Sequence, residues 1–346
     1  MMPKESFLSI LRMEDTDYIP VFPRDLTLGL DAYGTTFDIF LRDLTPEFSA
    51  RCVLKLQEQC GHDVTVGCIR TQQKGVFGGK VTRSTNGMPQ ISEAPFADIE
   101  DMDKHHPEEA INDRVRINNE ASRIVARERP DLALVDNCST PMGMAMGLRG
   151  IETFVMDMMV QPDIVDRLMD FGTKVSELLL KNTVIEETDA AFLAAAYDNP
   201  DIVGDEPYER RSLPGVKSMT DIAHDMGIPM IFHPHGVFST EDRLELLKRT
   251  IIKTGIDGFQ FAESNDPEGI VSQTDGRCAI LGGLDPYTVL LMGPEERIVR
   301  KIDQYMDVLS GHHYIPMCSC SLHVGLPIEN LRTMVHAAHT YRERHT

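Results

Sequence analysis

Short apolar runs alternate with amphipathic helical patterns along most of the chain. From residue 130 onward, runs long enough for a buried strand are separated by stretches with apolar residues at helical spacing. The predicted strands are residues 133–138, 190–197, 229–233, 258–263, 278–283 and 313–318, and the predicted helices are residues 150–158, 161–182, 214–226, 240–253, 267–275, 294–309 and 327–342. Such alternation predicts a parallel sheet with helical crossovers.

The first third of the chain adds two predicted strands, residues 18–22 and 63–68, with a helix over 46–60 between them. The total approaches eight strand–helix units, which fits either a doubly wound open sheet or a (β/α)8 barrel. No G-x-G-x-x-G turn follows an early strand, and 346 residues suit a barrel. We therefore predict an α/β protein with a (β/α)8 TIM barrel, formed by one domain over residues 1–346 with a helical or loop extension at residues 1–17.

The charge balance excludes some classes of partner. The chain has 34 Lys and Arg against 54 Asp and Glu, a formal net charge of −20. This disfavours binding to nucleic acid or to an anionic membrane surface, both of which attract basic proteins. There is no apolar run of transmembrane length and no signal-peptide pattern at the start, so we expect a cytoplasmic protein. The seven cysteines are scattered, which is typical of reduced thiols.

Polar and metal-ligating side chains follow nearly every predicted strand. In a β/α barrel, the carboxyl ends of the strands meet at one mouth, where the active site lies. We therefore expect the side chains in these positions to face the same mouth. They are Ser139, Thr140, Asp198, His233, His235, Glu263, Asp285, Cys318, Cys320 and His323.

The histidines and cysteines of this set point to a metal site. Imidazole and thiolate are the ligands that zinc prefers, and a catalytic zinc takes about three of them. His233 and His235 are two residues apart, so in a regular strand both side chains point to the same side. Cys318 and Cys320 have the same spacing, and His323 follows closely. The alternative interpretation is small buried cysteines and hydrogen-bonded histidines at strand ends.

Two carboxylates are further candidates for chemistry. Asp198 and Glu263 each stand at the end of a predicted strand, where either could act as a general base or as an additional metal ligand. Solvated carboxylates are also common at strand ends, and that alternative stays open for both residues.

Several phrases, in the right order over nearly the whole chain, are similar to those of a known family. The chain resembles the uroporphyrinogen decarboxylase superfamily, and within it the cobalamin-dependent methyltransferase branch of the methylcobalamin:coenzyme M methyltransferase type. The phrases that carry the resemblance are residues 140–154 (TPMGMAMGLRGIETF), 198–214 (DNPDIVGDEPYERRSLP), 231–236 (IFHPHG), 282–286 (GGLDP), 293–296 (GPEE), Cys320, and 327–331 (PIENL).

The resemblance implies a barrel of the decarboxylase type and a zinc held by a His-x-Cys pair and a distant Cys. His233 and Cys320 match that pattern, whereas His235 replaces the middle Cys. The implied ligands are therefore His233, His235 and Cys320, with Cys318 as a candidate fourth. Asp198 is expected, together with Glu263, to orient the substrate or tune the zinc.

The implied activity is transfer of a methyl group between a cobalamin and a small thiol, folate or methylated substrate. The cobalamin would arrive on a separate corrinoid protein, because the chain lacks the D-x-H-x-x-G motif of a cobalamin-binding domain. One alternative is a decarboxylase-like enzyme, for which Arg24 supplies one basic residue without the surrounding arginine motif. Another is a non-catalytic barrel that binds a tetrapyrrole or another small ligand. We allow for a homodimer.

Overall fold

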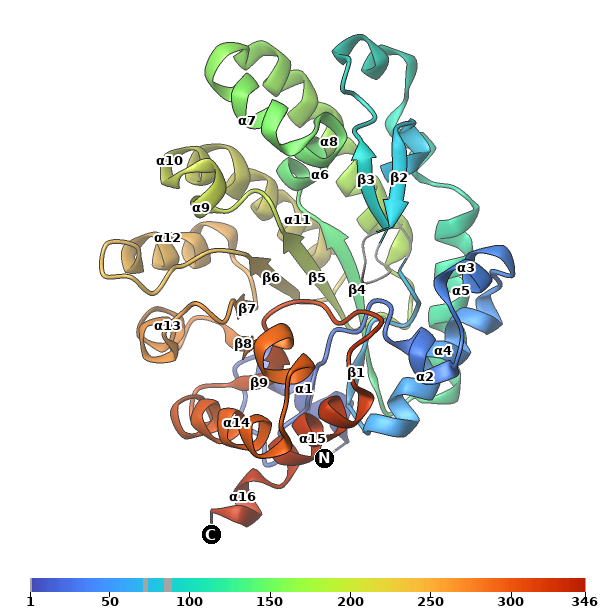
Figure 1. Cartoon of the computed structure of the whole chain (residues 1–346). Helices are drawn as coiled ribbons and strands as arrows, with labels where there is room; N and C mark the ends of the chain where they lie inside the picture. Colours follow the sequence, from blue (N-terminus) through green and yellow to red (C-terminus); the bar gives the residue numbers. More distant parts are fainter. Residues whose placement is uncertain (1, 71–73, 84–88, 346) are drawn as a thin grey trace.

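The computed structural model describes residues 2–70, 74–83 and 89–345 and has a curved parallel sheet of seven strands at its centre (Figure 1). The strands lie in the order β1-β4-β5-β6-β7-β8-β9, and each neighbouring pair is parallel. Their bounds are β1 Val64–Thr65, β4 Ala133–Ser139, β5 Ala190–Ala195, β6 Met230–Pro234, β7 Gly258–Phe261, β8 Ala279–Leu284 and β9 Tyr314–Cys318. The predicted α/β class and barrel-like parallel arrangement are confirmed.

An extended segment closes the gap between the first and last strands of the sheet. The N–H of Phe22 donates to the carbonyl oxygen of Pro316 in β9 at 3.1 Å, and the N–H of Asp63, just before β1, donates to the carbonyl oxygen of Val21 at 3.2 Å. Residues 21–25 therefore occupy the place of an eighth strand, and we call them the closing segment.

The predicted strand over residues 18–22 is not formed as a regular strand. Only isolated parallel bridges join this part of the chain to the end of β9 and the residues after it. The reason is local, because Pro20 and Pro23 stand on either side of Val21 and Phe22 and neither proline has an N–H to donate to a sheet. The second early strand is also shorter than predicted, since β1 covers only two residues of 63–68.

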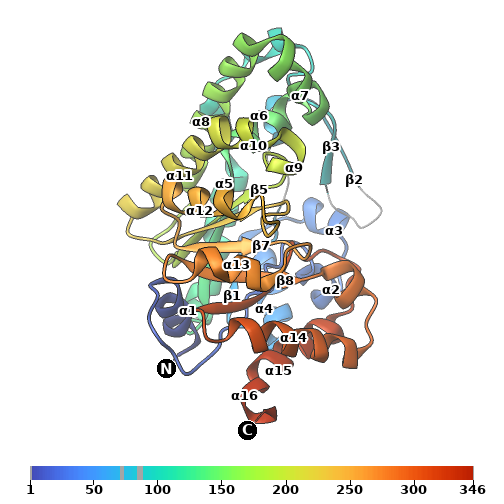
Figure 2. The ribbon, with the colours of Figure 1, turned by 90° about the vertical axis from the view of Figure 1, so that its left-hand side faces the viewer.

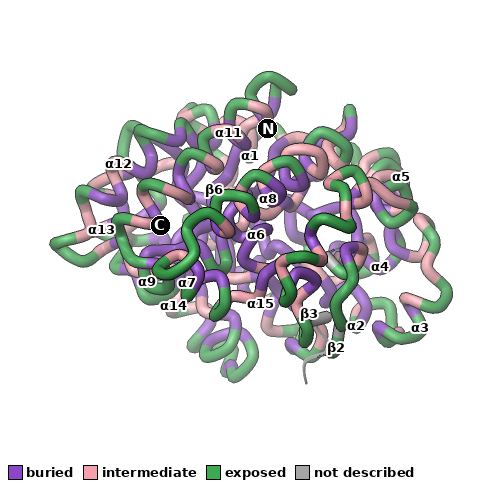
Figure 3. The backbone as a smooth tube through the Cα atoms, turned by 90° about the horizontal axis from the view of Figure 1, so that it is seen from above, coloured by how far each residue is buried: buried purple, intermediate pink, exposed green. Residues whose placement is uncertain are grey.

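Helices form the outer layer of the molecule, and their outward faces are largely exposed (Figure 3). The longer ones are α1 Pro3–Leu11, α4 Pro46–Cys60, α5 Asp113–Glu128, α6 Pro141–Arg149, α7 Ile151–Val160, α8 Pro162–Thr183, α11 Leu213–Asp225, α12 Leu244–Thr254, α13 Pro267–Thr274, α14 Glu295–Leu309 and α15 Ile328–His339. The shorter ones are α2 Gly29–Tyr33, α3 Phe37–Arg42, η1 Lys74–Phe77, η2 Ile99–Lys104, η3 Pro107–Ala110, α9 Pro200–Val203, α10 Asp205–Pro207, η4 Tyr208–Ser212, η5 Pro286–Leu291 and α16 Tyr341–Arg344. Within the described residues, no helix is long and apolar enough to cross a membrane.

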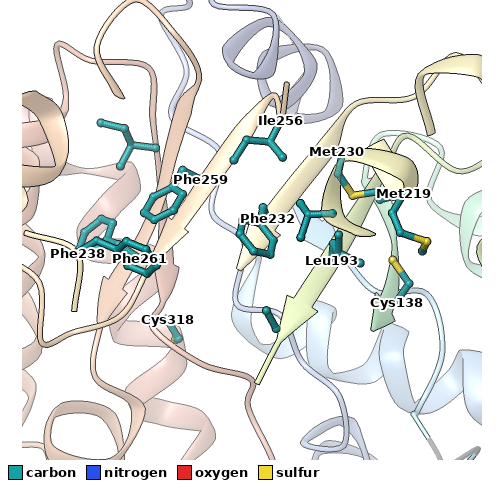
Figure 4. Close-up of a cluster of buried hydrophobic side chains, with 14 of the residues drawn as sticks. Cys138, Leu193, Met219, Met230, Phe232, Phe238, Ile256, Phe259, Phe261 and Cys318 are labelled. Carbon is teal, nitrogen blue, oxygen red and sulfur yellow. The ribbon is translucent and has the colours of Figure 1, made fainter. Parts of the chain in front are cut away.

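Alternating side chains divide the apolar core into an inner and an outer part. Phe192 and Ile231 belong to the cluster inside the barrel, whereas their neighbours Leu193 and Phe232 belong to the cluster under the helices (Figure 4). Phe7 of α1 joins the inner cluster, and α1 contacts β1, β4 and β9. The helix thus helps to fill the barrel from the end where the two chain termini lie (Figure 2), which leaves the carboxyl ends of the strands for the site.

A small antiparallel hairpin is inserted between β1 and β4. It consists of β2 Lys80–Arg83 and β3 Pro89–Glu93 and lies apart from the parallel sheet (Figure 1). The sequence pattern did not predict this hairpin.

A buried ion pair between Arg149 and Asp157 holds the residues that follow the hairpin against helices α6 and α7. Arg149, at the end of α6, donates through Nε to Asp157 Oδ2 at 2.7 Å. Its Nη1 donates to the carbonyl oxygens of Phe96 and Ala97 at 2.9 and 2.7 Å. The side chains of Arg149 and Asp157 are only 8% and 4% exposed.

Candidate metal centre

Two histidines at the end of β6 point into the mouth of the barrel. His233 lies opposite Ala194 of β5 in the parallel ladder, and His235 follows directly after the strand. The centroids of their two rings are 4.4 Å apart. Both side chains therefore lie on the same side of the chain, as the two-residue spacing predicted.

Cys320 approaches the same point from the other side of the mouth. Its Sγ lies 3.9 Å from Nε2 of His235. One ligand atom from each of His233, His235 and Cys320 lies within 4.8 Å of the others, and this trio is the metal-ligating cluster found among the described residues. Two imidazoles and a thiolate that converge in this way could hold a zinc ion and leave one position open.

The state of His233 tests whether these residues fit a metal. Both of its ring nitrogens are buried, and neither has a hydrogen-bond partner among the described residues. Burial lowers the pKa of His233 well below its usual value, with smaller contributions from His235 and Arg24. A neutral imidazole with a free lone pair is what a metal requires, whereas a buried ring with no partner is costly without one. The trio therefore fits zinc.

The thiol of Cys320 has a lowered pKa, which favours the thiolate form that binds metal. Burial acts to raise its pKa, but the hydrogen bond with His235 and the positive charge of Arg24 outweigh burial and lower the pKa to about 7. Free cysteine thiols titrate near pH 8.5, and the deprotonated form is the one that binds metal. Cys320 differs in this respect from the other cysteines with a shifted pKa, all of which are raised by burial.

Arg24, in the closing segment, brings a buried positive charge to the centre. The residue is 4% exposed and adopts a left-handed backbone conformation with φ of 48°. Its Nε donates to Asn137 Oδ1 at 2.9 Å, and its guanidinium carbon lies 4.4 Å from the centroid of the Phe192 ring. Within the described parts of the chain it forms no ion pair, and burial lowers its pKa to about 10. A buried cation without a carboxylate partner is suited to meet an anionic group of a ligand.

Two candidates from the end of β9 lie outside the trio. Cys318 is fully buried, and its Sγ contacts Met334 Sδ at 3.7 Å. His323 bonds through Nε2 to Ser321 Oγ at 2.8 Å. Strand β9 ends at Cys318, so the two-residue alternation of a strand does not extend from Cys318 to Cys320.

The two candidate carboxylates have different surroundings. Asp198 is fully buried and accepts hydrogen bonds from Thr140 Oγ1 at 2.8 Å and Ser212 Oγ at 2.7 Å. It thereby links the residue before α6 to the end of η4. Glu263 is exposed and lines a groove on the outside of the barrel together with Asp285. Neither carboxylate belongs to the metal-ligating trio.

A cavity of about 630 Å³ lies beside the trio. Its walls include Phe37, Tyr287 and Leu291, and Ser321 and His323 line it on the side of Cys320. Mostly apolar walls with a few polar groups are typical of small-molecule sites. Sequence reasoning missed the contributions of Ser321 and Phe37, because neither carries a signal in its local pattern.

Comparison with known proteins supplies an independent line of evidence. A sequence profile described as uroporphyrinogen decarboxylase (URO-D) matches residues 2–341. Two curated relatives, each called methylcobamide:CoM methyltransferase MtbA, come from Methanosarcina acetivorans and Methanosarcina mazei. Both are 24% identical, with 98% of each chain covered.

Solved structures agree on the architecture. A methyltransferase from Methanosarcina mazei superimposes with a TM-score of 0.80 at 17% identity over 99% of both chains. A B12-independent methionine synthase from Shewanella sp. W3-18-1 gives a TM-score of 0.53 at 11% identity, over 95% of this chain and 97% of the other. At these identities the structures bear on the fold alone, but the family profile covers almost every residue. The chain belongs to the uroporphyrinogen decarboxylase family.

Proposed function

We propose that the chain is a corrinoid-dependent methyltransferase that moves a methyl group between a cobalamin and a small thiol, folate or methylated substrate. The observation that carries the proposal is the trio of His233, His235 and Cys320, in which the buried imidazole of His233 has no hydrogen-bond partner among the described residues. The names of the two Methanosarcina relatives support the same class of reaction.

The three ligands would hold a zinc ion at the mouth of the barrel. When bound, zinc keeps a thiol substrate deprotonated at neutral pH, or polarises the leaving group of a methylated substrate. The imidazole of His235 brings no negative charge where the related pattern has a thiolate. The centre is therefore more positive, and it would favour an anionic ligand atom.

The remaining residues would bind and orient the reactants. Arg24 would hold an anionic part of the small substrate, since its Nη donors face no carboxylate among the described residues. Asp198 would hold the backbone at the mouth of the barrel in place through its hydrogen bonds from Thr140 and Ser212. Glu263 is exposed and would contact a reactant or partner that approaches from solvent. We propose that a separate corrinoid protein presents the cobalamin at this mouth.

Metal content tests the proposal directly. Elemental analysis of the purified wild type should find about one zinc per chain, and methyl transfer from free methylcobalamin to a panel of thiols and folates should follow. Zinc in His235→Cys but not in the wild type would mean that the imidazole at position 235 prevents the site from binding zinc. Zinc without transfer to or from any panel member would favour a binding barrel instead.

Arg24→Met should change the choice of acceptor. Charge-assisted hydrogen bonds contribute about 1.5–3 kcal/mol, so kcat/KM for a carboxylate- or sulfonate-bearing thiol should fall roughly 10- to 100-fold more than kcat/KM for neutral 2-mercaptoethanol. Assays of methyl transfer from free methylcobalamin measure both ratios. Arg42→Met is the matched control, because Arg42 pairs with Asp43 on the surface. Equal losses for charged and neutral thiols would contradict the role given to Arg24.

A further inference from the structure

A hydrogen-bonded chain of side chains leads away from Cys320. Ser321 Oγ lies 3.9 Å from Cys320 Sγ and 2.8 Å from His323 Nε2. On the other side of the ring, His323 Nδ1 lies 3.2 Å from Thr27 Oγ1, which also accepts the backbone N–H of Val324 at 3.2 Å. Ser321, His323 and Thr27 are all buried. The chain therefore joins the candidate ligand to the residues just after the closing segment.

One arrangement of protons gives every member of this chain a partner and also gives the thiolate a donor. The N–H of Val324 can only donate, so Thr27 Oγ1 accepts at that end and its own proton is free for His323 Nδ1. At the other end, a metal-bound sulfur is a thiolate that can only accept. His323 is neutral, since burial lowers its pKa to about 4. With its one ring proton on Nε2, the ring donates to Ser321 Oγ and accepts from Thr27 Oγ1 on Nδ1, and the Ser321 hydroxyl proton is left for Cys320 Sγ.

We propose that Ser321 is a positioning residue for Cys320, and that its hydroxyl donates a hydrogen bond to the thiolate when the metal is bound. The inference rests on the proposed function and deepens it by saying how the one thiolate of the site is held. Such a bond orients the sulfur toward the metal. It also withdraws negative charge from the sulfur, so that the metal stays a stronger Lewis acid.

The position of Cys320 in the fold explains why a support is needed. Cys320 lies two residues beyond the end of β9, so ladder hydrogen bonds do not fix its side chain. It is also the only member of the trio that can carry a negative charge. Orientation of this sulfur and the charge on it therefore depend on the side chains around it, and Ser321 is the neighbour that can donate from a fixed direction.

Cobalt substitution measures the proposed bond without reference to activity. In the Co(II) form of the full chain, Ser321→Ala should move the sulfur-to-cobalt charge-transfer band to longer wavelength, because a thiolate without a donor gives up charge more easily. Competition with a chelator should show zinc binding weakened about 10-fold. Ser321→Thr keeps the hydroxyl and should restore both values. A merely structural role for the serine would not move the band.

A second variant tests the chain at its far end. Thr27→Val removes the hydroxyl that orients His323 without touching Cys320 or Ser321, and it should shift the band in the same direction by less. The effects of Thr27→Val and Ser321→Ala should be non-additive, because both act through one chain. An unchanged band and unchanged zinc affinity in Ser321→Ala would overturn the inference while the proposed function stands. A wild type that binds no zinc would overturn both.

Discussion

Replacing Cys320 by alanine should remove zinc and methyl transfer together. Cys320 supplies one of three protein ligands, and its sulfur is the only thiolate among them. The binding free energy of zinc at structural sites with four ligands is about 10–16 kcal/mol, so each ligand contributes roughly 3–4 kcal/mol. Zinc affinity should therefore fall by about a few hundred-fold. Elemental analysis after dialysis against a weak chelator measures the zinc, and methylcobalamin assays measure transfer.

Cys318 provides a matched control two residues away. Its thiol is buried against Met334 and lies outside the trio, so Cys318→Ala should keep its zinc and most of its activity. A loss of zinc in Cys318→Ala would show instead that Cys318 serves as the fourth ligand. Full activity in Cys320→Ala would refute the proposed metal site, whatever the result for Cys318→Ala.

Replacing Arg149 by methionine should destabilise the fold by about 3–5 kcal/mol. The substitution leaves the carboxylate of Asp157 buried without its cationic partner, and it removes the donors that satisfy the carbonyl oxygens of Phe96 and Ala97. An uncompensated buried charge is the costly result, more than the loss of the pair itself. Urea or guanidinium unfolding followed by circular dichroism measures the change in free energy.

A double variant separates the cost of leaving the Asp157 charge unpaired from the cost of losing the ion pair itself. Arg149→Met combined with Asp157→Leu removes both charges, so it should be more stable than Arg149→Met alone. A surface pair such as Lys217 with Asp221 is the comparison, and Lys217→Met should cost less than about 1 kcal/mol. If Arg149→Met also cost less than about 1 kcal/mol, the buried pair would not stabilise the fold as its contacts indicate.

Local pattern was a good guide to the regular elements of this fold. Runs such as residues 133–138 and 190–197 became β4 and β5, because buried parallel strands need continuous apolar residues. The segment around Phe22 was predicted as a strand from the same apolar signal. It pairs with β9 only at isolated bridges, since the prolines beside it cannot donate. The hairpin of β2 and β3 escaped prediction because its strands are only four and five residues long and rich in polar residues.

The same contrast holds within the site. The His233–His235 spacing predicted two rings on one side, because both residues stay close to strand geometry. The Cys318–Cys320 spacing failed to predict a shared direction, because the strand ends between them. Contacts such as that between Thr27 and His323 join residues 296 positions apart. No local pattern encodes such a contact, and only the closed barrel brings the two residues together.

The closing segment has a consequence for the order in which this protein is completed during synthesis. Thr27 is translated 296 residues before its neighbour His323, and Arg24 is likewise made long before Cys320. The contacts between them are of long range, and closure of so long a loop is a slow step in folding. Nascent chains would therefore leave the closing segment without its β9 partner until residues 314–318 are made, and only a chain translated through residue 320 would carry all three members of the trio.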